Sequence, residues 1–396
     1  MRLTPRARRA IEVVCVAVVL IGTAWLLYLA LTEYFFNGGD AQIYVNAVRH
    51  WWAGEGLYDF ANEIGFGFTY PPFAALVVSA VAWLPGRAAS LAFQIVVLVG
   101  VFVLVAIVVR SLKVRDVRFA TLVIGTGLVF SYPVLREFVS GQVDIVLAIM
   151  VAVDLLVLRG TRYQGLLTGV AAAIKLTPAA FGLFFVADKQ LRPVINAAIG
   201  GLGATAIGFL VSPGASIEFW TRRLWETERV GHVAVALNQN LAAVVVRAFR
   251  TESFSGTGRS VWAGLVLATI ALGWWAIRRA LKARVPALGF AVAGLVMLLI
   301  SPISWLHHWA FVVVVFTVLA IFIVRTRGVW WIVAALLGLP VLVLAPWWLF
   351  GPAVTWVSLP LVLAGSYPVI WAVFVLVVAA TAPLPSSVSG EPAPSA

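Results

Sequence analysis

Three polar features stand out in a chain of 396 residues that is otherwise mostly apolar. Asp40 follows two glycines, Lys175 lies inside an apolar run, and the pair His307 and His308 follows a proline-containing turn. A carboxylate can take a proton from a hydroxyl as a general base. Lysine and histidine can stabilise a developing negative charge, such as that of a phosphate. These residue types therefore indicate general-base chemistry and phosphate handling as candidate functions.

The segment around Asp40 allows two interpretations. Apolar side chains recur at helical spacing over residues 44–51, which predicts a short amphipathic helix on the membrane surface, beginning just after Asp40. An aspartate directly before a helix is a favoured N-cap. That capping role competes with the general-base role for the same oxygens. Asp59 and Glu63, farther along the loop, are expected to be surface charges.

Lys175 is a cation inside an apolar run, which is costly in a membrane and therefore indicates a functional site. Snorkelling towards the interface, or pairing with Asp154, is the alternative. His307 and His308 are adjacent in the sequence. Adjacent helical side chains point about 100° apart, so at most one histidine is expected to face a given site directly.

Further polar segments carry weaker signals. Gln142 and Asp144 in the sequence SGQVD are ordinary residues for the start of a helix. Apolar residues at helical spacing over 217–224 predict a second interfacial helix. A polar cluster follows that is suited either to binding sugar hydroxyls or to capping the next helix. Its members are Asn238, Gln239 and Asn240.

Composition excludes several classes of protein. Hydrophobic residues make up 62% of the chain and charged residues 11%, so it cannot be a soluble globular enzyme. The formal net charge of +12 comes from basic residues scattered between apolar runs, which is typical of cytoplasmic loops and not of a nucleic-acid-binding face. With one cysteine, Cys15, and four histidines that lack zinc-site spacing, neither a disulfide framework nor a metal site is predicted.

Apolar runs continue almost from end to end and predict a single all-α polytopic membrane domain over residues 1–382. We expect about ten to twelve transmembrane helices, with short interfacial helices in the outer-face loops 32–71 and 213–259. The Pro- and Ser-rich tail 383–396 is expected to be disordered and cytoplasmic. The apolar runs are 11–31, 72–85, 89–110, 119–132, 143–159, 164–187, 193–212, 260–280, 286–302, 306–325, 329–349 and 358–381.

Two of these runs, 72–85 and 164–187, are difficult to assign. The first is shorter than the roughly 17 to 25 residues that span a bilayer, and Lys175 and Pro178 interrupt the second. If both runs fold back, more basic residues lie on the cytoplasmic side, as the positive-inside rule favours. If both cross, the basic residues are almost evenly divided. The two arrangements place Gln142 on opposite faces, and both stay open at this point.

Six motifs, taken together, resemble glycosyltransferase family 87, membrane enzymes of the GT-C class that use a polyprenyl-phosphate sugar as donor. The resemblance covers most of the chain, and it implies a GT-C-like fold with a full second helix at 72–85. The motifs are GGDAQIY at 38–44, FTYPPF at 68–73, SGQVD at 140–144, AAIKLTP at 172–178, NQNL at 238–241 and SPISWLHH at 301–308.

The resemblance also implies roles for single residues. Asp40 would be the catalytic base, which deprotonates a mannose 2-hydroxyl that attacks the anomeric carbon with inversion. The donor phosphate would be bound by His307, His308 and Lys175. Leu306 stands where several relatives carry an acid, so any role of that acid is absent here or supplied elsewhere. No metal or other cofactor is implied. The expected substrate-binding residues are Tyr70, Gln142, Asn238, Gln239, Asn240 and Trp305.

Within the family, the chain looks most like actinobacterial enzymes that add an α-1,2-linked mannose to phosphatidylinositol mannosides. The implied partners are polyprenyl-phosphate-mannose, a glycolipid acceptor and membrane lipids. The implied setting is a monomer in the plasma membrane, with its active site on the outer, periplasmic face. One alternative is a related enzyme that acts on lipomannan or lipoarabinomannan, or that transfers arabinofuranose. An alternative of another class is a lipid or sugar transporter or flippase.

Overall fold

The computed structural model describes residues 4–33, 38–63, 65–250, 256–345 and 359–385. Within these ranges the chain is built from helices, and the only β pairings there are two isolated bridges, Ala61 with Gly67 and Asn238 with Trp305. Most of the predicted disordered tail, residues 386–396, lies outside the described residues. The expectation for that tail therefore stays a prediction.

Five helices among the described residues are long and apolar enough to cross a membrane, and two bent helix pairs raise the number to seven. The described chain is therefore an all-α multi-pass membrane protein, as predicted. The five are α1 (Pro5–Thr32), α4 (Gly86–Ser111), α10 (Leu191–Val211), α13 (Gly256–Lys282) and the continuous segment of η6 (His308–Phe311) with α15 (Val312–Thr326). The bent pairs are α5 (Val117–Val129) with α6 (Tyr132–Ser140), at 73°, and α17 (Leu359–Gly365) with α18 (Tyr367–Thr381), at 67°.

The other apolar runs form shorter helices, because proline and polar residues interrupt them. The expected ten to twelve spans therefore exceed the five to seven that length and composition support among the described residues. The shorter apolar helices are α3 (Pro72–Ala82), η3 (Thr177–Phe181) with α9 (Gly182–Ala187), α14 (Pro286–Ile300) and α16 (Val329–Val343). The run 143–159 forms α7 (Asp144–Ala152) and a π-helical turn, η2 (Val153–Val157).

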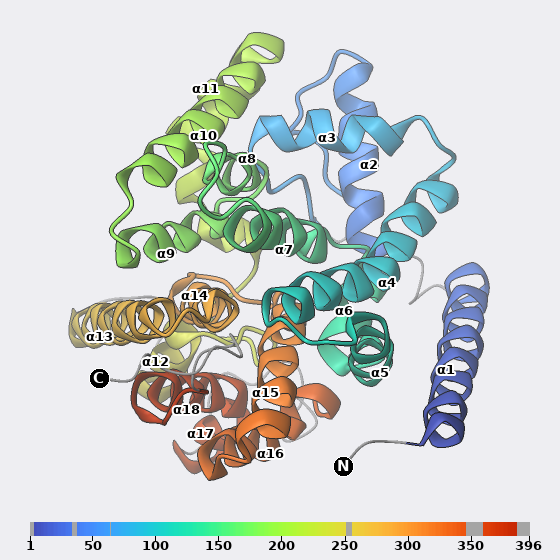
Figure 1. Cartoon of the computed structure of the whole chain (residues 1–396). Coiled ribbons are helices and arrows are strands. Elements are labelled where there is room, and N and C mark those ends of the chain that lie inside the picture. Colours follow the sequence, from blue (N-terminus) through green and yellow to red (C-terminus); the bar gives the residue numbers. More distant parts are fainter. Residues whose placement is uncertain (1–3, 34–37, 64, 251–255, 346–358, 386–396) are drawn as a thin grey trace.

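The centre of the bundle is formed by α14 and α15. Of the apolar stretch in η6 and α15, 72% is buried, compared with 11% for both α1 and α10. Figure 1 shows α1 at the edge of the bundle, and it packs against α5 and α4. The exposed apolar surfaces of α1 and α10 suit contact with lipid tails.

The run 72–85 forms a helix, α3, that is shorter than a membrane span. Helix α3 has 11 residues. Just beyond its end, Arg87 donates to the carbonyl oxygen of Leu31, at the end of α1, over 2.6 Å. Arg49 on the surface helix α2 (Gly39–Trp52) donates to the carbonyl oxygen of Ala82 over 2.9 Å. The first contact holds the start of α4 at the end of α1, and the second holds the end of α3 beside α2. Helix α3 is therefore shorter than the full helix that the family resemblance implies.

The run 164–187 folds back, as a hairpin of α8 (Leu166–Ile174) with η3 and α9. Lys175 is the tip of this hairpin, where the backbone leaves the helix in an extended conformation. An ion pair of 2.9 Å between Arg159 and Asp188 joins the two ends of the hairpin. Both difficult runs therefore form short helices, as the fold-back arrangement requires, and Gln142 lies beside Asp40.

The second predicted interfacial helix is shorter than expected. Helix α11 (Pro213–Thr221) ends before Leu224, because the backbone of Arg222 leaves the helical region, and Leu224 lies in η4 (Arg223–Trp225). A further turn, η5 (Thr227–Val230), and helix α12 (Leu241–Phe249) complete this part of the chain.

Candidate active site

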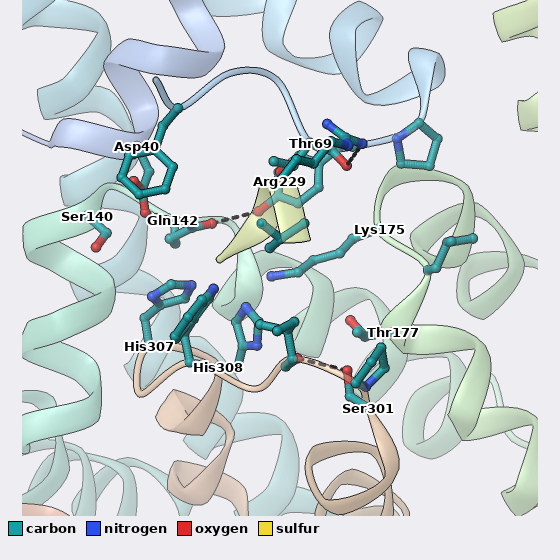
Figure 2. Close-up of a pocket in the computed structure, with 18 of the residues that line it drawn as sticks. Asp40, Thr69, Ser140, Gln142, Lys175, Thr177, Arg229, Ser301, His307 and His308 are labelled. Carbon is teal, nitrogen blue, oxygen red and sulfur yellow. Dashed lines mark hydrogen bonds between the residues drawn. The ribbon is translucent and has the colours of Figure 1, made fainter. Parts of the chain in front are cut away.

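A cavity of about 770 Å³ collects side chains from segments that lie far apart in the sequence. Its walls come from α2, the loop 66–71, α6 and the residues after it, the hairpin tip at Lys175, and the turn 301–308. Figure 2 shows Asp40, Ser140 and Gln142 on one side, His307 and His308 below them, and Lys175 extending into the space between. The three predicted chemical features therefore meet in one place.

Two glycines bring Asp40 and Gln142 together. Gly38 has a φ of 77° and forms the N-cap of α2, and Gly141 has a φ of 66° and ends α6. A Cβ atom at Gly141 would lie 2.7 Å from the Cβ of Ala41, so only glycine allows the end of α6 to approach the start of α2 this closely. The sequence adopts this geometry because both turns require a positive φ, and glycine stands at each of them.

Asp40 is not the N-cap of α2. The helix begins at Gly39, its N-cap is Gly38, and no side chain caps it, so the capping interpretation of Asp40 is wrong. The carboxylate instead accepts a hydrogen bond from Nε2 of Gln142 at Oδ2, over 2.8 Å, and another from Ser140. The aspartate is thus free of a helix-capping role and opens onto the cavity.

The electrostatic surroundings of Asp40 contain opposing effects. Burial raises the pKa of the Asp40 carboxyl above its ordinary value, and this effect exceeds the lowering by the Gln142 hydrogen bond and by the positive charges of Arg136 and Lys175. A raised pKa makes the ionised carboxylate a stronger proton acceptor, which suits a general base. Asp59 and Glu63 are exposed, as predicted.

Lys175 is held by an ion pair with Asp144. Its Nζ lies 2.7 and 2.9 Å from the two carboxylate oxygens. The alternative pairing with Asp154 is wrong, because Asp154 caps the start of α8. Its Oδ1 accepts from the backbone N–H of Gly165 over 2.7 Å, and its Oδ2 accepts from that of Thr168 over 2.8 Å.

Both His307 and His308 line the cavity. Their ring centroids lie 4.5 Å apart, and the ring planes are nearly perpendicular. The expectation that at most one histidine faces the site is wrong. It assumed a regular α-helix, whereas His307 ends an irregular turn and His308 begins the 3-10 turn η6.

The polar cluster of Asn238, Gln239 and Asn240 lies outside the cavity lining, so its predicted contact with sugar hydroxyls is not supported. All three side chains are fully buried. Asn238 Oδ1 accepts from the backbone N–H of Ser304 over 2.8 Å. Asn240 caps α12 and donates to the carbonyl oxygen of Ser301 over 2.7 Å. The cluster holds the turn that carries the histidines, because the side chains of Asn238 and Asn240 bond its backbone groups.

Comparison with known proteins identifies the family. A model of glycosyltransferase family 87 matches residues 68–302. A Mycobacterium tuberculosis protein named polyprenol-phosphate-mannose-dependent alpha-(1-2)-phosphatidylinositol mannoside mannosyltransferase is 33% identical over 369 residues, which is 86% of this chain and 84% of that protein. The chain belongs to glycosyltransferase family 87. It is therefore a glycosyltransferase, and the transporter alternative is excluded.

Other relatives of this family-87 protein have similar names. A Mycolicibacterium smegmatis protein with the same name as the first is 32% identical over 370 residues, 86% of this chain and 82% of its own. A second protein of that organism, named as a phosphatidylinositol pentamannoside mannosyltransferase with the same donor dependence, is 28% identical over 340 residues, 82% of each chain. The predicted likeness to enzymes of phosphatidylinositol mannosides is confirmed.

The family-87 cavity also contains residues that the sequence did not single out. Arg136 and Tyr44 lie in its wall near Asp40, and Tyr44 is one helical turn after it on α2. Arg229 donates to the carbonyl oxygens of Phe68 and Thr69, over 2.8 and 3.3 Å, and so fixes the loop that carries Tyr70. Two adjacent charged residues, Arg136 and Glu137, in a short and mostly apolar helix were the available signal for Arg136. Tyr70 and Trp305, both predicted, line the cavity.

One group of side chains could hold a metal ion. A carboxylate oxygen of Asp144 and ring nitrogens of His307 and His308 lie within 4.8 Å of one another. The ammonium group of Lys175, however, contacts both carboxylate oxygens of Asp144. A divalent ion would have to displace this lysine and would meet its positive charge. The arrangement therefore fits Lys175 as the cation beside Asp144 better than it fits a bound metal ion.

Proposed function

We propose that the protein is an inverting mannosyltransferase that moves mannose from polyprenyl-phosphate-mannose to a phosphatidylinositol mannoside and forms an α-1,2 linkage. The observation that carries the proposal is one cavity that holds the Asp40 carboxylate together with Lys175 and the histidine pair. The names of the mycobacterial relatives support the donor, the acceptor and the linkage.

The reaction balances with these groups. Asp40 takes the proton from the 2-hydroxyl of an acceptor mannose, and the oxygen attacks the anomeric carbon of the donor. The bond between this carbon and the phosphate oxygen breaks, and polyprenyl phosphate leaves with the bonding electron pair. Attack on the face opposite the phosphate converts a β-linked donor into an α-linked product. Lys175, His307 and His308 stabilise the charge that develops on the phosphate.

The fold supports a setting in a membrane. Both substrates are lipids, and a multi-pass membrane domain presents them to the cavity without extraction into water. We place the protein in the plasma membrane with the cavity towards the outer face, because the basic residues concentrate at the opposite end. The proposed active unit is a monomer. No metal or other cofactor is part of the proposal.

The test is a transfer assay with purified protein in lipid nanodiscs, polyprenyl-phosphate-mannose as donor and a panel of phosphatidylinositol mannosides as acceptors. We expect one added mannose, in an α-1,2 linkage that an α-1,2-specific mannosidase removes. Asp40→Asn should lower transfer by about 10²- to 10⁴-fold, the usual contribution of a general base. Asp59→Asn, at an exposed position of the same loop, is the matched control and should keep full activity.

Two outcomes would change the proposal. Wild-type turnover in Asp40→Asn would remove the base assignment. Transfer only from polyprenyl-phosphate-arabinofuranose, or only to lipomannan or lipoarabinomannan, would keep the reaction type and replace the donor or the acceptor.

A further inference from the structure

Behind Asp40, three side chains form a closed ring of hydrogen bonds. The hydroxyl of Tyr44 donates to that of Tyr70 over 3.1 Å, and the hydroxyl of Tyr70 donates to Oε1 of Gln142 over 2.7 Å. Nε2 of Gln142 donates back to the hydroxyl of Tyr44 over 2.9 Å. The second hydrogen on Nε2 goes to Oδ2 of Asp40, over 2.8 Å. One N–H of Gln142 therefore points out of the ring, and it donates to the Asp40 carboxylate.

The ring joins three separate parts of the chain. Tyr44 lies on α2, Tyr70 in the loop before α3, and Gln142 after α6, and all three side chains are buried. The loop is held in turn by the hydroxyl of Tyr58, which donates to the carbonyl oxygen of Tyr70 over 2.8 Å. Burial raises the pKa of both Tyr44 and Tyr70, so their hydroxyls keep the protons that the ring needs.

The bonding leaves Gln142 no hydrogen for a substrate. A glutamine amide has two N–H groups, and both are used within this cluster. The orientation of the amide is fixed as well. If it were reversed, its oxygen would face the carboxylate of Asp40, which would repel it, and its N–H groups would face the hydroxyl of Tyr70. The roles expected for Tyr70 and Gln142 as direct substrate ligands therefore fit the structure less well than a role in holding Asp40.

We propose that Tyr44, Tyr70 and Gln142 are positioning residues, whose hydrogen-bond ring fixes the Asp40 carboxylate through Oδ2, while the lone pairs that Gln142 and Ser140 leave unused are directed to the acceptor hydroxyl. This inference rests on the proposed function of Asp40 as general base. It adds the residues that orient the base, and it assigns Gln142 as a donor that stabilises the ionised form of Asp40. A buried polar network in which every member is satisfied holds its members rigidly.

Gln142→Met tests the proposal, because it keeps the length of the side chain and removes both donors. We expect kcat to fall about 10- to 100-fold, the loss of one hydrogen bond to a charged group. The KM for the acceptor should change less than threefold. The acidic limb of the pH profile of kcat/KM should move to higher pH, because one of the two hydrogen bonds that favour ionised Asp40 is gone.

Two further variants keep the test decisive if Gln142→Met folds poorly. Tyr70→Phe opens the ring and removes the bond that orients the amide, so it should shift the pH profile in the same direction by a smaller amount. Gln142→Glu should shift it farther, because a second carboxylate beside Asp40 opposes its ionisation. Gln164→Met is the matched control, since Gln164 is also buried, its side-chain oxygen accepts from the backbone N–H of Gly160, and it lies outside the cavity wall.

The outcomes separate this inference from the proposed function. A raised KM with unchanged kcat and pH profile would make Gln142 a substrate ligand and overturn the proposal. A lower thermal midpoint with an unshifted pH profile would reduce the ring to a structural element and also overturn it. If wild-type protein transfers no mannose, the proposed function fails. If wild type is active, Asp40→Asn is inactive and Gln142→Met behaves as wild type, only the ring proposal fails.

Discussion

The ammonium group of Lys175 lies 5.4 Å from the centroid of the Tyr70 ring. A cation at this distance is attracted by the electrons of an aromatic ring. Tyr70 therefore contacts both halves of the candidate site, through its hydroxyl on the Asp40 side and through its ring on the phosphate side. The two halves still differ in chemistry, so they can be tested separately.

Replacing Lys175 should abolish most of the transfer. Lys175→Met removes the cation proposed to stabilise the leaving phosphate, and we expect kcat to fall about 10²- to 10³-fold. The single variant also leaves Asp144 without its partner. Lys175→Met combined with Asp144→Asn removes that unpaired charge and should recover stability but not activity. Lys282→Met, at an exposed position in the last turn of α13, is the control. Recovery of transfer in the double variant would contradict the role of Lys175.

Chelators should leave the activity unchanged. Because Lys175 already contacts both oxygens of Asp144, we expect equal turnover with and without excess EDTA, and no stimulation by Mg²⁺, Mn²⁺ or Zn²⁺. Metal content of the purified protein, measured by mass spectrometry, provides the second readout. Loss of turnover with EDTA that one of these ions restores would instead assign a metal to Asp144, His307 and His308.

Both histidines should matter. Since both line the cavity, His307→Ala and His308→Ala should each lower kcat about 10- to 100-fold, the loss of a hydrogen bond to a charged phosphate. His232→Ala, at an exposed position, serves as the control. If one of the two variants keeps full turnover, that histidine only packs in the turn.

Transfer should decrease at acidic pH, from a midpoint above the ordinary aspartate pKa of about 3.9. Only the ionised carboxylate can accept a proton, and burial raises the pKa of Asp40, so a larger fraction is protonated and inactive at a given low pH. The measurement is kcat/KM between about pH 4.5 and 8. Samples returned to neutral pH before assay control for irreversible loss. A profile that stays flat to the lowest pH would argue against Asp40 as the titrating base.

Gly141→Ala should damage both folding and activity. The residue has a φ of 66°, and a new Cβ would lie 2.7 Å from that of Ala41. A non-glycine residue in this conformation costs about 1–3 kcal/mol, and the clash moves Gln142 away from Asp40. We expect a lower thermal midpoint together with a reduced kcat. Gly127→Ala is the control, because that glycine lies within α5 with open space beside it. Equal behaviour of the two variants would show that the close approach is unimportant.

Much of the site could be predicted because charged residues in apolar segments are rare and costly. Asp40, Lys175 and the histidine pair each stand out against an apolar background, and all line the cavity. The breaks in the runs could be predicted for the same reason, since Lys175 and Pro178 cannot continue an undisturbed membrane helix.

The partners of these side chains in ion pairs and hydrogen bonds could not be predicted, because they depend on distances that only the folded chain defines. Asp144 and Asp154 both precede Lys175 in the sequence, and only the folded chain shows that Lys175 forms its ion pair with Asp144. The Asn238 cluster has the composition of a sugar-binding site, yet it is buried outside the cavity lining, and its members bond backbone groups. The glycines beside Asp40 were visible, but their role depends on the opposite glycine at 141.

The hairpin that ends at Lys175 connects the reactive centre to the far end of the bundle. Its two ends are joined there by Arg159 and Asp188, and its tip supplies the cation. A substitution at this distant ion pair can therefore displace Lys175 without touching either lipid. Reduced turnover after a change at that end of the bundle is consequently no evidence that the altered residue contacts substrate.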